Sequence, residues 1–401
     1  MKRIWLCMIM GFCAALPSFA QLRMNGWGRA VWLPVYIDQS GETKTIVQSS
    51  YGDLPDLEFT FSASSENIGA DIGVIVGQGT FNQIGNAKIW WKPNRYFKLH
   101  IGLGRVATLR GKVESSTGAY SYARGRITGL TLPTGKNEPI VLIDDGDGIF
   151  SRFNLSKMGA IMEITPLPGL FIGAAVAPNS LVNNGLLAKD VYRGLHVAAG
   201  YEINNIGHIR MGYIGGGRNG SPAGNAGENW DFSWDQRIEA AFALTAVENL
   251  LIDFGLKYSL EDHPGTLDQP GFSLENPLYA AVGVMFTGIP NLRLGFAVDG
   301  HFAGTAEAGK DGAAITSAPQ IAFNIYPTYD LGIFAIGGDL TYGIQFGDME
   351  GVNDKQNLGF GLHIQKQYGH GNVRGGIALN PPLENGEKWG FAVPLWITYS
   401  F

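Results

Sequence analysis

Hydrophobic and polar residues alternate along much of this 401-residue chain. Between Phe97 and Leu103, every second residue is apolar, and the residues between them are lysine, histidine and glycine. Successive side chains of a strand point to opposite faces, so this period of two predicts strands with one apolar face. Four further segments repeat the pattern: 208–213, 237–244, 250–258 and 292–299.

The links between the alternating segments come in two lengths. A soluble β-sandwich also has alternating strands, but it has no reason to keep short links at one end and long ones at the other. That asymmetry is typical of outer-membrane barrels, whose short turns lie in the periplasm. The short links include 93–95, 166–169, 204–207, 247–249 and 288–291, and the long ones, rich in Gly, Asn and Asp, include 215–233, 261–275 and 303–317.

The pattern therefore predicts an all-β fold, an antiparallel up-and-down transmembrane β-barrel. Counting from Arg23 to Phe401 gives about 18 strands, with 16 as the alternative, and both termini then lie in the periplasm. Segments 56–63 and 321–326 have the weakest alternation. A barrel of this size is wide enough to hold water.

Residues 1–20 have the three parts of a cleavable secretory signal: two basic residues, the apolar stretch 4–16 and a small-residue site ending at Ala20. We expect cleavage after Ala20, which leaves residues 21–401 as the barrel. The apolar stretch is too short to span a bilayer, which takes about 20 apolar residues. Both cysteines lie in this leader, so the mature chain would carry no thiol.

Composition narrows the class further. The chain has 57 glycines and only 16% charged residues, which suits β-structure, and no linker or composition shift divides it into domains. Without the two basic residues of the leader, 27 basic residues face 35 acidic ones, a formal charge of −8. This acidity argues against a nucleic-acid partner.

Motifs for bound cofactors and for catalysis are absent from the sequence. It has no paired His or Cys at metal-ligand spacing, no Walker or dinucleotide glycine motif, and no Ser-x-x-Lys or nucleophile-elbow pattern. We therefore expect no cofactor, no metal and no enzymatic activity.

The last alternating segment, 389–401, ends the chain on Phe401. It resembles the C-terminal strand of bacterial outer-membrane barrels, and this resemblance implies that Tyr399 and Phe401 are read by the barrel-assembly machinery. Together with the leader and the connection pattern, the whole chain resembles a porin-type barrel, with no single subfamily indicated. Pro394 departs from the pattern because proline lacks a ladder donor, so we expect a bulge or kink there.

The resemblance implies a porin-like channel for passive diffusion of small hydrophilic solutes across the outer membrane of a diderm bacterium. The alternatives are a substrate-specific channel for a sugar or a hydrophobic compound, and a surface adhesin or structural barrel. The implied partners are outer-membrane lipid and small solutes or ions, and assembly as a homotrimer is left open. A hydrophobe channel would need an N-terminal hatch, for which strand-like sequence from Arg23 leaves no room.

The longest connection, 106–153, follows the expected fifth strand. General porins fold the loop after that strand into the barrel, so the resemblance implies a constriction here; a mobile external loop is the alternative. Opposed charges across a narrow lumen create a transverse field that sets ion preference. The carboxylates of Asp144, Asp145 and Asp147 could also hold a calcium ion. They lack the downstream bidentate Glu of an EF-hand loop, and this favours an acidic turn without a metal. The charges are Arg110, Lys112, Arg124 and Arg126, then Asp144, Asp145 and Asp147.

Alternation also assigns side chains to the lumen wall. The assigned wall is more basic than the chain as a whole, which predicts a mild anion preference. Histidines 100, 196, 208 and 363 and Trp90 also face inward. Tyrosines near strand ends fit membrane-interface girdles, or simply strand propensity: Tyr201, Tyr213, Tyr258, Tyr279, Tyr342 and Tyr399. The assigned wall charges are Lys88, Lys92, Lys98, Arg210, Arg237, Lys257, Arg293 and Arg374 against Glu239, Asp253, Asp299 and Asp339.

Overall fold

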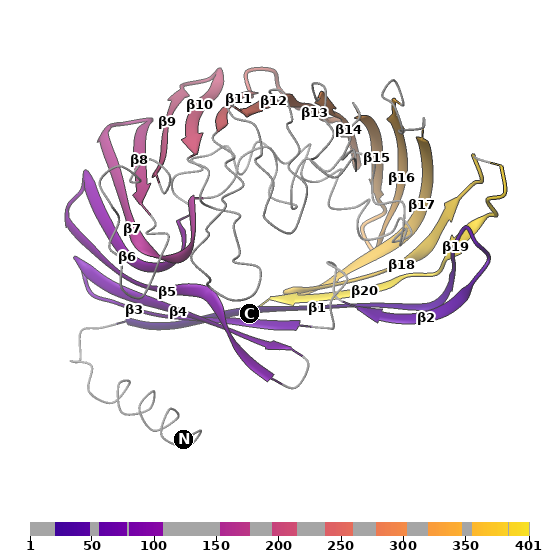
Figure 1. Cartoon of the computed structure of the whole chain (residues 1–401), viewed down its shortest axis with the longest axis horizontal. Helices are drawn as coiled ribbons and strands as arrows, with labels where there is room; N and C mark the ends of the chain where they lie inside the picture. Colours follow the sequence, from indigo (N-terminus) through magenta and orange to yellow (C-terminus); the bar gives the residue numbers. More distant parts are fainter. Residues whose placement is uncertain are drawn as a thin grey trace, which may run out of the picture.

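The strands form one closed antiparallel sheet, seen as a ring in the computed structural model of Figure 1. Closure occurs at β1 (Gln21–Ile37), which pairs with β3 (Asp56–Ser64) along one edge and with β20 (Leu395–Ser400) along the other. The predicted all-β barrel is confirmed. The structure describes residues 21–48, 56–77, 80–106, 153–176, 195–214, 237–259, 278–302, 320–346, 355–383 and 385–400.

From β3 to β18, each strand pairs with its neighbour in the chain, so the topology is up-and-down. The further strands are β2 (Thr43–Gln48), β4 (Ile68–Gly77), β5 (Thr80–Asn94), β6 (Phe97–Val106), β7 (Phe153–Leu167), β8 (Leu170–Val176), β9 (Leu195–Ile203), β10 (Gly207–Ile214), β11 (Arg237–Leu244), β12 (Leu250–Ser259), β13 (Leu278–Ile289), β14 (Leu292–Phe302), β15 (Gln320–Asp330), β16 (Ala335–Gln345), β17 (Lys355–Tyr368), β18 (Gly371–Asn380) and β19 (Gly390–Ala392).

The described residues contain 20 strands, rather than the expected 18 or the alternative of 16. Two breaks account for the difference. β2 and β3 pair with successive parts of the same edge of β1, and β19 and β20 pair with successive parts of β18. The second break falls at Pro394, where the sequence predicts a bulge. Its carbonyl accepts a hydrogen bond from the backbone N–H of Gly376 (3.1 Å).

Short turns gather at one end of the barrel. Three of them contain an asparagine with positive φ: Asn205 (62°), Asn249 (61°) and Asn291 (63°). Asparagine tolerates this left-handed conformation better than most residues. The first and last described strands begin and end at this same end, because Gln21 pairs with Ser64 beside one turn and the N–H of Ser400 donates to His370 in another.

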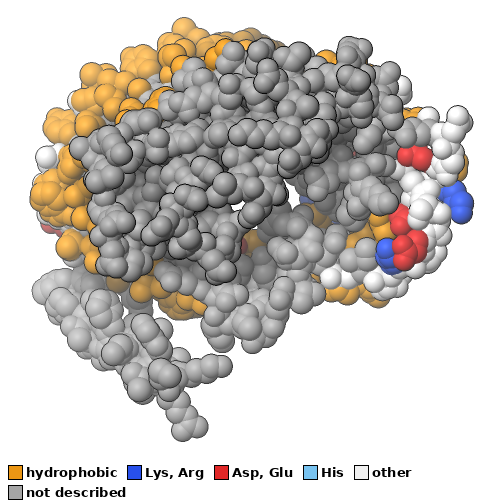
Figure 2. Space-filling model, viewed as in Figure 1, with side chains coloured by type: hydrophobic (Ala, Val, Ile, Leu, Met, Phe, Trp, Pro, Cys, Tyr) orange, Lys and Arg blue, Asp and Glu red, His pale blue; other side chains and the backbone are white. Residues whose placement is uncertain are grey.

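The two faces of the sheet have opposite character. Ile101, Met211 and Ile364 on the outer face are 56%, 57% and 54% exposed, whereas Arg210 and Glu239 on the inner face are 1% and 0% exposed. Figure 2 shows hydrophobic side chains over the outside of the barrel. Soluble proteins place charges outside, so this arrangement is that of a barrel with lipid around it. Separately, no described helix has the length and apolarity to cross a membrane.

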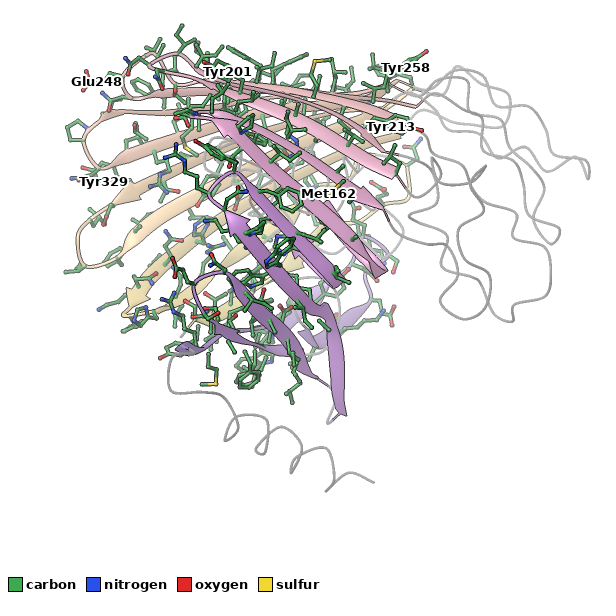
Figure 3. The ribbon with its side chains drawn as sticks, turned by 90° about the vertical axis from the view of Figure 1, so that its left-hand side faces the viewer. Met162, Tyr201, Tyr213, Glu248, Tyr258 and Tyr329 are labelled. Carbon is green, nitrogen blue, oxygen red and sulfur yellow. The ribbon has the colours of Figure 1, made fainter. Side chains whose placement is uncertain are left out.

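Tyrosines lie toward both ends of the barrel, as Figure 3 shows. Tyr329 and Glu248 both lie at the short-turn end, and Tyr213 and Tyr258 lie near the opposite end. Tyr213 and Tyr258 both pair with Ile238, so the three form one cross-strand row. This placement fits the aromatic girdles that flank an apolar band about 25 Å tall.

β1 and β18 continue past the band as an extension with β2 and β19, seen at the right of Figure 1. Its core is a small apolar cluster of Leu33, Tyr36, Ala378, Ala392 and Trp396. At the tip, the Gln39 amide donates to the Pro381 carbonyl (3.1 Å), and the Lys388 N–H donates to the Gln39 carbonyl (2.8 Å). These bonds fasten the β1–β2 turn to the connection that follows β18.

Candidate functional site: the inner wall of the barrel

Bulky side chains of the inner face lie flat over residues that are small. A Cβ at Gly200 would come within 3.0 Å of the Phe171 ring, and one at Gly69 would come as close to Trp90. On β13 and β14 the inner face carries alanines, among them Ala281 and Ala297, which are 2% and 0% exposed. The small residues of the wall therefore leave the space in which the large side chains lie along it.

The wall from β4 to β7 carries a mixed strip of charges. The Lys88 ammonium lies 3.6 Å from the Asp71 carboxylate. On the next strand pair, His100 Nε2 contacts Glu163 Oε1, and both side chains are at least 93% buried. Lys98 lies opposite Glu163 in the ladder. In a buried site, paired polar atoms interact strongly and unpaired ones are costly. The stability of this strip therefore depends on the register that sets which charges face each other across neighbouring strands.

A second group of charges lies on β10, β11 and β12. His208, Arg210, Glu239 and Asp253 are all at most 6% exposed. Arg210 pairs with Ala241, while Glu239 stands two residues along β11 on the same face. These neighbouring strands gather a guanidinium and two carboxylates in the interior of the barrel, where burying a charge is costly unless it is compensated.

A third group joins three strands through one histidine. Tyr326 Oη lies 3.4 Å from His363 Nε2, and the two rings stack with centroids 5.9 Å apart. On the other side, His363 Nδ1 lies 3.6 Å from Asp339 Oδ2. Gly337 provides the space, because a Cβ there would come within 3.0 Å of the imidazole. The row resembles a proton relay but is sealed, with exposures of 0%, 1% and 4% for Tyr326, His363 and Asp339.

Aromatic residues line the inner face near the closure of the barrel. The Trp27 indole N–H donates to the Glu58 carboxylate at 2.8 Å. The Arg374 guanidinium lies 5.6 Å from the Trp396 ring centroid. Sequence reasoning did not single out Trp27, Trp396 or Tyr326, although each occupies a polar-side position of its alternating segment.

The structure places most of the expected wall residues inward. Lys88, Lys98 and Arg374 are half-buried, and the histidines 100, 208 and 363 are buried. Lys92 and Arg293 are exposed near the short-turn end. Tyr399 points outward and is 51% exposed. The side chains outside the described set are those of His196, Arg237, Lys257, Tyr279, Asp299 and Phe401, and the proposed constriction residues Arg110, Lys112, Arg124, Arg126, Asp144, Asp145 and Asp147 lie outside the described residues altogether.

Among solved structures, the chain is similar to outer-membrane channels of low sequence identity. These include Acinetobacter baumannii OccAB4 (TM-score 0.51, 9% identity, covering 96% of this chain and 98% of that one) and Pseudomonas aeruginosa OccK5 (0.50, 10%, 95% and 98%). Salmonella typhi OmpF, solved with daunomycin, is similar at 0.50 and 10%, covering 96% and 98%. No protein-family model and no curated protein matches the chain. The chain thus has a porin-type barrel fold, with no single subfamily indicated.

Proposed function

We propose that this protein is a porin-like channel in the outer membrane that lets small hydrophilic solutes diffuse passively. The observation that carries the proposal is the reversed polarity of the barrel. Its outer face exposes Ile101, Met211 and Phe254, while its inner face holds Arg210, Glu239 and His363. A polar interior inside an apolar shell provides a path for solutes that lipid excludes.

A channel accounts for the inner wall better than an enzyme does. The Tyr326–His363–Asp339 row comes nearest to a catalytic arrangement, but its three side chains are at most 4% exposed. A general base must come within hydrogen-bond reach of its substrate, and these groups are covered. We therefore assign the row to the construction of the wall.

A substrate-specific sugar channel is the second candidate. Trp27, Trp90 and Trp396 all lie on the inner face of the barrel. Trp27 also holds a carboxylate through its indole N–H, and flat apolar rings beside hydrogen-bonding groups are the kind of surface that binds sugars. Such a channel would be blocked by its own substrate.

Export, assembly and the constriction also belong to the proposal. Residues 1–20 would be removed as an export signal, and Phe401 with Tyr399 would be read by the barrel-assembly machinery. The loop 106–153 would narrow the lumen, with Arg110, Lys112, Arg124 and Arg126 facing Asp144, Asp145 and Asp147. Homotrimer assembly, as in many porins, also belongs to the proposal.

The test is the conductance of the purified, folded protein in a planar lipid bilayer, with heat-unfolded protein as the control. The channel proposal predicts discrete, long-lived current steps, and a salt gradient should give a reversal potential of the sign that marks mild anion preference. A millimolar sugar that reduces the current in a saturable way would favour the sugar channel. Absence of current from a barrel verified as folded would contradict both channel proposals and favour a plugged or adhesive barrel.

A further inference from the structure

Lys98 differs from its charged neighbours in lacking a carboxylate partner among the described residues. Lys88 is within 3.6 Å of Asp71, and the imidazole of His100 contacts Glu163. Glu163 stands opposite Lys98 in the β6–β7 ladder, yet its carboxylate contacts the histidine instead. Among the described residues, the wall from β4 to β7 therefore presents an ammonium, that of Lys98, that makes no ion pair with a carboxylate.

Trp90 holds that ammonium at the inner face. Lys98 Nζ lies 4.5 Å from the centroid of the Trp90 ring. The ring itself is fixed, because it lies against Gly69, where a Cβ would come within 3.0 Å of it. A cation over an indole face is attracted to the ring without losing its net charge. The ammonium is thus positioned and still able to attract an anion.

Two further polar groups surround the same indole. Lys88 lies two residues from Trp90 on β5, hence on the same face, and brings a second ammonium. His100 pairs directly with Trp90 across β5 and β6. It is 4% exposed, and its Nδ1 has no hydrogen-bond partner among the described residues. Buried polar atoms normally make a hydrogen bond, so Nδ1 adds a polar group to the wall beside the indole.

We propose that Lys98, Lys88 and Trp90 form a binding subsite for small carboxylates on the inner wall. The solute carboxylate supplies the partner that Lys98 lacks. Its two oxygens can each accept from a different ammonium group, whereas a halide ion has only one atom to share between them. This inference rests on the proposed function, because the subsite is useful only if solutes pass along the wall. Such binding must remain weak enough for the solute to leave again.

The experiment measures single-channel conductance in a concentration series of potassium acetate and, separately, of potassium chloride. A binding subsite makes the acetate conductance saturate. We expect Lys98→Gln to raise the half-saturating acetate concentration about five- to tenfold, as loss of a charged hydrogen bond does, and to change the chloride series less. Lys98→Arg should retain saturation because it keeps the charge.

A matched control exists on the same barrel. Lys366 also lies over an aromatic ring, 5.3 Å from the centroid of Tyr368, but it is exposed at the short-turn end and points away from the lumen. Lys366→Gln should leave the acetate series unchanged. Asp71→Asn tests the subsite in the opposite direction: it removes the carboxylate beside Lys88, so the half-saturating acetate concentration should fall.

The possible outcomes separate the two proposals. Open channels whose acetate saturation is the same in Lys98→Gln and the wild type would overturn the subsite and leave the channel intact. Absence of current from the folded wild type would overturn the channel itself. If Lys98→Gln fails to assemble, Asp71→Asn decides, and an unchanged half-saturating concentration in that variant overturns the subsite.

Discussion

The two faces of strand β12 differ in polarity, because one faces lipid and the other faces the lumen. Phe254 points outward and is 41% exposed, while its neighbour Asp253 points inward and is 6% exposed. Ile252 and Leu256 share the outer face, and Gly255 shares the inner one. The position of a residue in the alternation, rather than its distance along the strand, thus decides whether a charge is accepted. Each of the following predictions probes that difference or the contacts that depend on it.

The largest effect is expected from a charge on the outer face. Phe254→Arg places a guanidinium in the apolar band and should destabilise the folded barrel by about 2–4 kcal/mol. Urea titration of the protein in lipid vesicles would measure this change. Phe254→Leu is the control and should cost less. Equal stability of the Arg and Leu variants would mean that water, not lipid, contacts this face.

The next effect comes from the tight packing on the inner face. Gly200→Ala adds a Cβ within 3.0 Å of the Phe171 ring, and such overpacking costs about 1–3 kcal/mol. The same titration should show that Phe171→Leu, added to Gly200→Ala, recovers most of the loss. If the double variant is no more stable than Gly200→Ala, the ring is not the obstacle.

A smaller effect is expected at the turns. Asn291 has a φ of 63°. Asn291→Ala should lower the free energy of unfolding by about 1 kcal/mol, because alanine is strained in this left-handed conformation and lacks a polar side chain that can hydrogen-bond locally. Asn291→Gly should be close to neutral. The difference between the two unfolding free energies is the informative quantity, and a value near zero would argue against a left-handed turn.

The smallest effect concerns the tip of the extension, outside the apolar band. The hydroxyl of Ser40, followed by the backbone N–H groups of Ser40 and Glu42, lowers the pKa of Asp38 below its ordinary value of 3.8. A lowered pKa means that these bonds stabilise the tip above the ordinary value and are lost as the pH falls through the lowered one. An NMR titration should place the Asp38 midpoint below 3.8, and Ser40→Ala should raise it. A midpoint at or above 3.8 would contradict the turn geometry.

Alternation predicted the fold because it reports directly which face each residue occupies. The segments 97–103 and 250–258 are strands β6 and β12, and the short links coincide with turns such as the one at Asn291. The strand number was wrong because β2 and β3 share one edge of β1, and β19 and β20 share one edge of β18, and alternation does not report how an edge is divided between strands.

The partners within the site could not be predicted in the same way. Tyr326 and His363 are 37 residues apart in the sequence. Their side chains meet across β16, with which both of their strands pair. Lys98 reaches Trp90 across a ladder whose register shifts between Trp91 and Asn94. Alternation gives the face of a residue, whereas register gives its neighbour. The constriction assigned to 106–153 stays a prediction, because a loop has no periodicity from which to assign faces.

The most direct test of the account labels one inward and one outward position on the same strand while current flows. The chain has no cysteine after residue 20, so in protein prepared without residues 1–20, Lys98→Cys and Leu99→Cys each introduce a single thiol. A charged, water-soluble thiol reagent added to open channels should change the conductance of Lys98→Cys in a discrete step and leave Leu99→Cys unaffected. A step in Leu99→Cys with none in Lys98→Cys would show that the polar face of this barrel does not line its pore.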